Sequence, residues 1–335
     1  MMLRHMILFG CLACQALFAS SPITWVSDYQ DALEQAHRDE KPLLLFFTGS
    51  DWSGWGMKMK KEILDSPQFA EKVGNHFVFV EIDFPKHKNL SSDESEQNVQ
   101  LKEKMDISEY PRLVVMDSTE REIARLGYTS EEGEVLGQDL LQIVERDQSL
   151  SRVMRELEFH SYSSSQLEGY YALAQELQRL DDCDRILEKG LRSSSPHFFQ
   201  LEKYRLLVEE GKREKAETVV LRHRLLESDS NNEKGAHFTL ALIDFQHLSC
   251  QEPLSREVIQ PLEEYLDKFG AQDSDNLWRI EMMIAQFYLD FDESLTALRH
   301  AETAFRSAPD EMKEEIGHSL DYIREQAGCI VSNSS

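Results

Sequence analysis

Apolar residues in the first part of the chain follow two different patterns. Short uninterrupted apolar runs are typical of strands that are buried on both faces of a sheet. Between these runs apolar positions recur at helical spacing, as at Ala32, Leu33 and Ala36. The alternation over residues 23–146 predicts an α/β domain with a mixed sheet flanked by helices. The predicted strands are 23–26, 43–47, 77–82, 113–116 and 122–126.

Polar residues mark where the predicted helices begin and where loops lie. Ser27 and Asp28 are favourable N-caps for a helix that ends near residue 40. Residues 85–96 are so rich in charged side chains that we expect a solvated loop there. A further helix is predicted over residues 98–106.

Strand signals stop near residue 148, and helical periodicity continues to the end of the chain. Helical hairpins are predicted to begin near Gln166, Phe198, Ala236 and Leu277. These irregular intervals lie in the range of helical repeat arrays, and their residue spacing resembles a tetratricopeptide repeat. We therefore expect an all-α, tetratricopeptide-like domain, with an unrelated helical bundle as the alternative.

The first twenty residues are typical of an export signal. Arg4 and His5 precede an apolar run over residues 6–18, which ends in small residues. This pattern predicts a periplasmic or secreted protein whose signal peptide is cleaved. The predicted division is a signal peptide at 1–20, an α/β domain at 21–147 and a helical domain at 148–330.

The cysteines do not form a disulfide scaffold. A C-x-x-C at residues 11–14 lies inside the predicted signal and would be removed with it. A lipoprotein anchored through Cys11 is the alternative, although Phe9 fits such a site poorly. An odd number of cysteines then remains, which allows at most one internal disulfide, and we expect small buried residues on helices. These are Cys183, Cys250 and Cys329.

The charge of the chain restricts its partners. The formal net charge is −25 and the pI about 4.8, so the summed field would repel nucleic acid and anionic lipid head groups. No later segment approaches the roughly 20 apolar residues of a membrane-spanning helix. We therefore expect protein or peptide partners, and neither nucleic acid nor a transmembrane segment.

One loop carries a resemblance to a known family. Residues 46–57 read F-F-T-G-S-D-W-S-G-W-G-M, and residues 110–117 read Y-P-R-L-V-V-M-D. The first segment resembles the active-site loop of the thioredoxin family, and the second resembles its cis-proline and following strand. The loop is most similar to exported bacterial thioredoxin-like proteins of the disulfide isomerase type that contain W-C-G-W-C. The resemblance covers residues 23–146 and implies a thioredoxin-like domain.

The sequence departs from this family at the two thiol positions. Ser53 and Gly56 stand where the family has cysteine, in the segment Ser53-Gly54-Trp55-Gly56. Thiol exchange needs a thiolate nucleophile and a second thiol that resolves the mixed disulfide. Neither serine nor glycine supplies one, so we expect no catalytic residue here. The loop also lacks the histidine base and the G-x-S-x-G turn of a serine hydrolase, and the histidines lack metal-site spacing, so we expect no metal and no cofactor.

The resemblance leaves a recognition surface at the same place. In the family, the loop before the cis-proline offers main-chain hydrogen bonds to an extended peptide, and the tryptophan lines the groove. Exposed aromatic residues suit such binding. The alternative is that these aromatic residues only preserve the fold. The residues expected at the binding site are Trp52, Ser53, Trp55, Gly56, Tyr110 and Pro111, with a cis bond between the last two.

Three functional hypotheses follow from these features. The first is a redox-inactive module that binds or chaperones envelope or secreted proteins. The second is a thiol-disulfide isomerase or oxidoreductase, as the resemblance implies, working through another thiol such as Cys183. The third is a structural part of an assembly.

Overall fold

The computed structural model describes residues 23–251 and 255–333, which form two compact units. The first unit consists of the chain up to Ser161 together with Ala172–Asp182. The second consists of Tyr162–Tyr171 and the chain from Cys183 onward. The predicted signal peptide, residues 1–20, lies outside the described residues.

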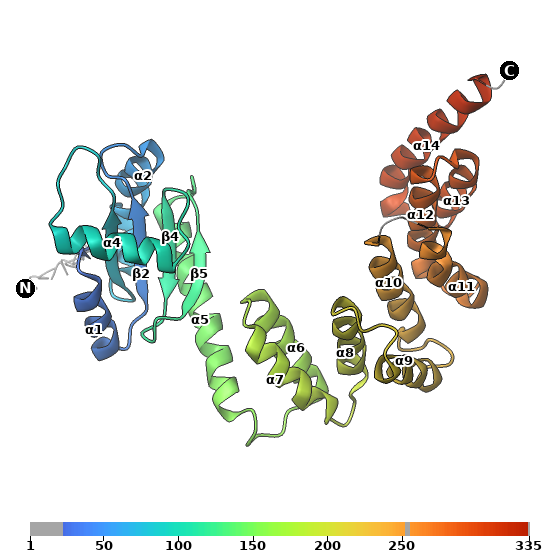
Figure 1. The fold of residues 1–335 in the computed structure, drawn as a ribbon, viewed down its shortest axis with the longest axis horizontal. Helices are drawn as coiled ribbons and strands as arrows, with labels where there is room; N and C mark the ends of the chain where they lie inside the picture. Colours follow the sequence, from blue (N-terminus) through green and yellow to red (C-terminus); the bar gives the residue numbers. More distant parts are fainter. Residues whose placement is uncertain (1–22, 252–254, 334–335) are drawn as a thin grey trace, which may run out of the picture. The chain divides into compact units, whose positions relative to one another are not determined.

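A five-stranded mixed sheet forms the centre of the first unit, as predicted (Figure 1). Its spatial order is β1-β3-β2-β4-β5. Strands β1 and β2 run parallel to β3, whereas β4 runs antiparallel to both β2 and β5. The strands are β1 (Trp25–Val26), β2 (Leu43–Thr48), β3 (Val78–Asp83), β4 (Arg112–Met116) and β5 (Glu122–Leu126).

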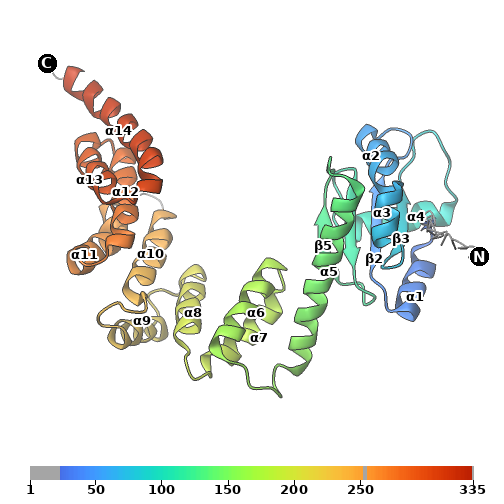
Figure 2. The ribbon, with the colours of Figure 1, turned by 180° about the vertical axis from the view of Figure 1, so that it is seen from behind.

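Helices cover both faces of the sheet because the central strand is apolar on both sides. Leu43, Leu45 and Phe47 of β2 pack into a core under α1 (Tyr29–Asp39) and α4 (Ser92–Lys104). Leu44 and Phe46 face the opposite core. That core lies under α3 (Pro67–Val73) and α5 (Gly133–Glu156), which Figure 2 shows in front of the strands. Alternate side chains of one strand therefore hold two layers of helices.

One predicted boundary was wrong. Helix α4 begins at Ser92, inside the segment 85–96 that we expected to be a loop, because the Ser91 hydroxyl accepts a hydrogen bond from the Glu94 N–H and caps the helix. The acidic residues that led us to expect a solvated loop lie in the first turn of this helix, where they interact favourably with the positive end of the helix dipole. The helix after β2 begins at Gly54, as α2 (Gly54–Met59), and continues through a π-helical turn, η1 (Lys60–Leu64).

Helices make up the rest of the described chain, and no strand follows Leu126 in it, which confirms the predicted fold class. Four of the helices begin within about three residues of the predicted hairpin starts. The helices are α6 (Ser164–Glu176), α7 (Leu180–Leu191), α8 (His197–Glu209), α9 (Ala216–Ser228), α10 (Ala236–Ser249), α11 (Gln260–Phe269), α12 (Ser274–Asp290), α13 (Ser294–Ser307) and α14 (Lys313–Asn333), with short 3₁₀ turns η2 (Arg256–Ile259) and η3 (Asp310–Met312). Within the described ranges no helix is both long and apolar enough to cross a bilayer.

A buried carboxylate joins three segments of the first unit. Asp147 of α5 is 2% exposed and accepts hydrogen bonds from Arg121 at 2.9 and 2.6 Å and from Arg179 at 3.1 Å. Arg121 precedes β5, and Arg179 follows α6, where it also donates to Ser151 and Asp182. Helix α5 runs through residue 147 without a break, so this network ties the end of α6 to the sheet side of the unit.

Replacing Asp147 with alanine should therefore destabilise the first unit. The change leaves two guanidinium groups without their shared partner. We expect the free energy of unfolding to fall by roughly 2–3 kcal/mol. This is no more than the smallest loss usual for a broken buried ion pair, because Arg121 is partly exposed. Urea unfolding of the full chain measures this loss. Glu145→Ala removes an exposed carboxylate from the same helix and should change the stability by less than about 0.5 kcal/mol. Equal effects of the two substitutions would contradict the assignment.

Candidate functional site: an aromatic groove beside the β2–α2 loop

Ser53 ends the β2–α2 loop and caps the helix that follows. Its backbone N–H donates to the Gly49 carbonyl at 2.8 Å, which closes the turn after β2. Its hydroxyl accepts a hydrogen bond from the Gly56 N–H at 3.2 Å, as an N-cap serine does. The side chain is only 6% exposed. Ser53 is thus a structural cap whose hydroxyl points into the turn.

Gly56 lies where the helix passes closest to β2. A Cβ atom there would be 2.4 Å from the Thr48 hydroxyl oxygen and 3.0 Å from that of Ser53. Thr48 is buried at the end of β2 and cannot move freely. The space that a side chain at residue 56 would need is therefore already occupied by Thr48.

Two carboxylates fix the loop to the segment after β3. Asp83 accepts hydrogen bonds from the Ser50 N–H at 2.7 Å and from the Ser50 hydroxyl at 2.5 Å. Asp51 accepts from the backbone N–H groups of Lys86 at 2.8 Å and His87 at 2.6 Å. The N–H of Lys86 contributes most to lowering the pKa of Asp51, because it stabilises the ionised carboxylate. These bonds hold two adjacent residues of the loop, Ser50 and Asp51, to the end of β3 and the segment that follows it.

Trp52 packs with other aromatic rings beside the loop. Its indole N–H donates to the Phe84 carbonyl at 2.6 Å, and its ring meets Tyr110 edge-on with centroids 5.6 Å apart. Phe84 also contacts Tyr110, at 5.4 Å. Gly49 permits this arrangement, since a Cβ there would be 2.3 Å from the indole. About a third of Trp52 remains exposed, so an apolar surface faces solvent beside Tyr110.

Trp55 extends the surface in another direction. It is 59% exposed and packs against Tyr128, with ring centroids 4.6 Å apart. Neither Tyr128 nor Phe84 was among the predicted site residues, because both contacts depend on segments that lie far away in the sequence. An aromatic residue two positions after the end of a predicted strand is the only sequence signal that either offers.

The Tyr110-Pro111 bond is cis, as predicted. Tyr110 is half-buried, and this burial raises the pKa of its phenol. Pro111 is buried, as are Ser53 and Gly56. Of the six predicted binding residues, the structure therefore exposes the rings of Trp52 and Trp55, partly exposes Tyr110, and buries the other three.

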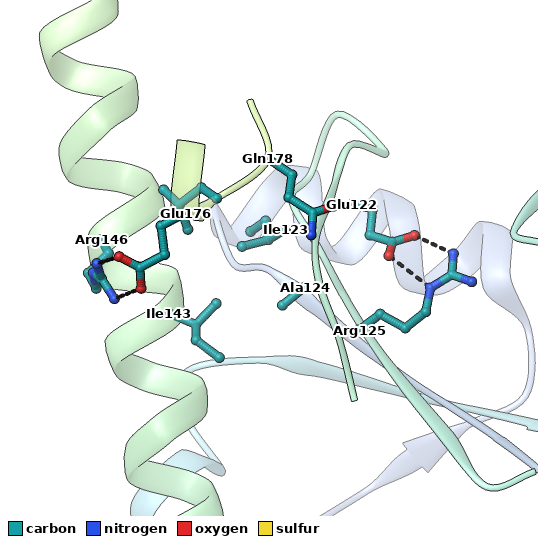
Figure 3. Close-up of a pocket in the computed structure, with 9 residues that line it drawn as sticks. Glu122, Ile123, Ala124, Arg125, Ile143, Arg146, Glu176 and Gln178 are labelled. Atoms are coloured by element: carbon teal, nitrogen blue, oxygen red, sulfur yellow. Dashed lines mark hydrogen bonds and ion pairs between the residues drawn. The ribbon is translucent and has the colours of Figure 1, made fainter. Parts of the chain in front are cut away.

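A cavity of about 690 Å³ lies at the β5 edge of the same unit. Its charged side chains neutralise one another: Arg125 pairs with Glu122, and Arg146 pairs with Glu176 (Figure 3). It contains none of the predicted site residues. Across the described ranges, no cluster of three or more His, Cys, Asp or Glu side chains is suited to hold a metal ion. The aromatic groove is therefore the stronger candidate for recognition of a partner.

Comparison with known proteins assigns the fold to a class. A family model described as a thioredoxin-like domain matches residues 29–136, which contain the sheet from β2 onward, the β2–α2 loop and the cis-proline. The chain thus has a thioredoxin-like domain.

Sequence similarity then identifies the family. The chain is 46% identical over 314 residues to the thioredoxin-related protein DsbJ of Chlamydia pneumoniae, covering 92% of this chain and 89% of that protein. It belongs to this family of thioredoxin-related proteins. It is also 38% identical over 110 residues to the disulfide bond reductase DsbH of Chlamydia pneumoniae, covering 33% of this chain and 66% of that protein. A solved structure described as DsbH oxidoreductase shares 31% identity, with a TM-score of 0.38, over 41% of this chain and 94% of that one.

The contact between Thr48 and Gly56 can be tested by a double-mutant cycle. Gly56→Ala should cost about 1–3 kcal/mol in unfolding free energy because its new methyl group overlaps the Thr48 hydroxyl. Adding Thr48→Ala removes that oxygen and should recover much of the loss. Thr48→Val keeps a branched side chain of the same shape and should recover none of it. Urea unfolding measures Gly56→Ala, the two single Thr48 variants and the two double variants. Equal recovery by Thr48→Ala and Thr48→Val would refute the steric explanation.

Proposed function

We propose that this chain is an exported, redox-silent thioredoxin-fold protein that binds extended segments of other exported proteins in the groove of Trp52, Tyr110 and Trp55. The single observation that carries this proposal is the state of the β2–α2 loop. Its aromatic residues remain exposed beside the cis-proline, while Ser53 serves as a helix cap and Gly56 has no space for a side chain. The surface that would contact a client is therefore present, whereas the thiols needed for disulfide exchange are absent from this loop.

The chemical argument depends on which atoms remain at the thiol positions. Ser53 and Gly56 occupy the places of the two cysteines in W-C-G-W-C relatives, and neither provides a thiolate. The Ser53 hydroxyl is also buried and already bonded to the Gly56 N–H. The groove therefore retains only non-covalent contacts, of which aromatic burial is the strongest.

Thiol-disulfide exchange is the second candidate function, because the relative DsbH is named a disulfide bond reductase. It would require another cysteine. Cys183 lies on α7 in the second unit and is buried, whereas an attacking thiolate must reach its substrate. Cys250 follows α10 and is exposed. It has no resolving cysteine close to it in the sequence.

The export part of the proposal rests on the signal-like residues 1–20, and the partner class rests on the charge of the chain. Cleavage after Ala19 or Ser20 would release a protein whose acidic character disfavours nucleic acid. Clients are therefore expected among periplasmic or secreted proteins.

The purified protein without residues 1–20 should not accelerate the reduction of insulin by dithiothreitol. A turbidity assay measures this, with the Cys183→Ser variant run in parallel. A thioredoxin with an intact C-x-x-C serves as the positive control. Reduction clearly faster than with dithiothreitol alone, and lost in the Cys183 variant, would favour the reductase instead.

Trp55→Ala should weaken client binding and leave the fold intact, since the indole is mostly exposed. The probe is reduced α-lactalbumin with its thiols blocked by iodoacetamide, a permanently unfolded and acidic chain. We expect a loss of at least about thirtyfold in affinity, equivalent to about 2 kcal/mol, as measured by fluorescence anisotropy. Phe159→Ala removes an even more exposed ring from the same unit and should have little effect. Equal losses in both variants would rule out the groove as the binding site.

A further inference from the structure

Lysine side chains stand over the aromatic rings of the groove. The Lys86 ammonium lies 4.3 Å from the centroid of Trp52, and that of Lys102 lies 5.9 Å from both Phe84 and Tyr110. Such contacts hold the cations at the rim of the aromatic surface. Within the described ranges, neither lysine has a carboxylate at ion-pair distance. Their charges are therefore available to a bound ligand.

The carboxylates closest to this rim are already occupied. Both oxygens of Asp83 accept hydrogen bonds from Ser50, and both oxygens of Asp51 accept backbone N–H groups. These bonds direct the negative charges toward the loop that they hold. Asp83 and Asp51 are thus hydrogen-bonded by groups of the two loops, and the ionised Asp51 also interacts with the charge of Lys88, which helps to lower the pKa of Asp51. Lys86 and Lys102 lie over the aromatic rings, although the whole chain carries a charge of −25.

A pocket of about 310 Å³ has Phe84 in its wall, and the ring of Phe84 contacts Tyr110. From α4 it is lined by uncharged side chains, although that helix carries three acidic residues in its first turns. Its charged lining residues are Lys88, which has no ion pair among the described residues, and Asp83, whose carboxylate is held by Ser50. The apolar walls include Phe84, Leu90 and Val99, and the polar lining includes Ser95.

We propose that the groove selects acidic client segments, with an apolar residue on the Trp52–Tyr110 surface and a carboxylate side chain in the adjoining pocket opposite Lys88. This specificity rests on the proposed function, because it concerns the same groove. A carboxylate in the pocket faces Lys88, while Lys86 lies over the ring of Trp52 and Lys102 over the rings of Phe84 and Tyr110. None of these lysines needs to leave another ion pair first. A basic segment is repelled by the same three lysines, and its binding is therefore disfavoured.

The overall negative charge of the chain gives this proposal a kinetic signature. Charge repulsion between the whole molecules slows the approach of an acidic ligand, while the local lysines hold it after contact. Because salt screens both effects, raising the salt concentration should increase both the association rate and the dissociation rate. A ligand held only by apolar contacts would not dissociate faster in salt.

Three synthetic peptides test the specificity. They share one tryptophan and one leucine and differ only in the flanking residues, which are aspartate, serine or lysine. We expect the aspartate peptide to bind the full chain most tightly and the lysine peptide most weakly. Lys86→Gln, Lys88→Gln and Lys102→Gln should each weaken the aspartate peptide by about two- to fivefold and leave the serine peptide unchanged.

Lys61→Gln is the matched control, since this exposed lysine of η1 also has no ion pair among the described residues. It changes the net charge equally and should leave binding of the aspartate peptide unchanged. An equal loss in Lys61→Gln, or tighter binding of the lysine peptide, would overturn the acidic specificity. If the serine peptide still depended on Trp55, the groove itself would stand. Failure of all three peptides to bind would overturn both the groove assignment and this proposal.

Discussion

The hydrogen bonds from Ser50 to Asp83 and from Lys86 and His87 to Asp51 set the geometry on which the candidate site depends. They join the loop after β2 to the end of β3 and the loop after it. Strands β2 and β3 are parallel neighbours, so their carboxyl ends lie at the same edge of the sheet. With the two loops joined, Trp52 reaches the Phe84 carbonyl and its ring stands beside Tyr110. Backbone and carboxylate contacts thus hold Trp52 and Tyr110 beside each other.

The sequence determines the sheet more plainly than the site. Strand β2 was predictable because both of its faces are apolar over five residues, and α1 because Asp28 caps it ahead of a regular apolar face. The start of α4 was missed because its capping serine and the acidic residues of its first turn resemble a solvated loop. Tyr128 and Asp147 were missed because their partners lie far away in the chain. Burial of the Ser53 side chain also depends on tertiary packing that no local pattern encodes.

The two relatives differ in how much of this chain they match. The similarity to DsbJ extends over 92% of the chain, whereas the similarity to DsbH extends over a third of it. The alignment with DsbJ therefore includes the helical region of this chain as well as its thioredoxin-like domain.

The buried Asp147 network has a consequence for how such a chain can evolve. Because Ala172–Asp182 belongs to the first unit and Tyr162–Tyr171 to the second, the backbone passes between the units at residues 161–162, 171–172 and 182–183. A gene break at any one of these points would leave at least one unit without a piece of itself. A single break in the gene at one of these points therefore cannot transfer the second unit whole.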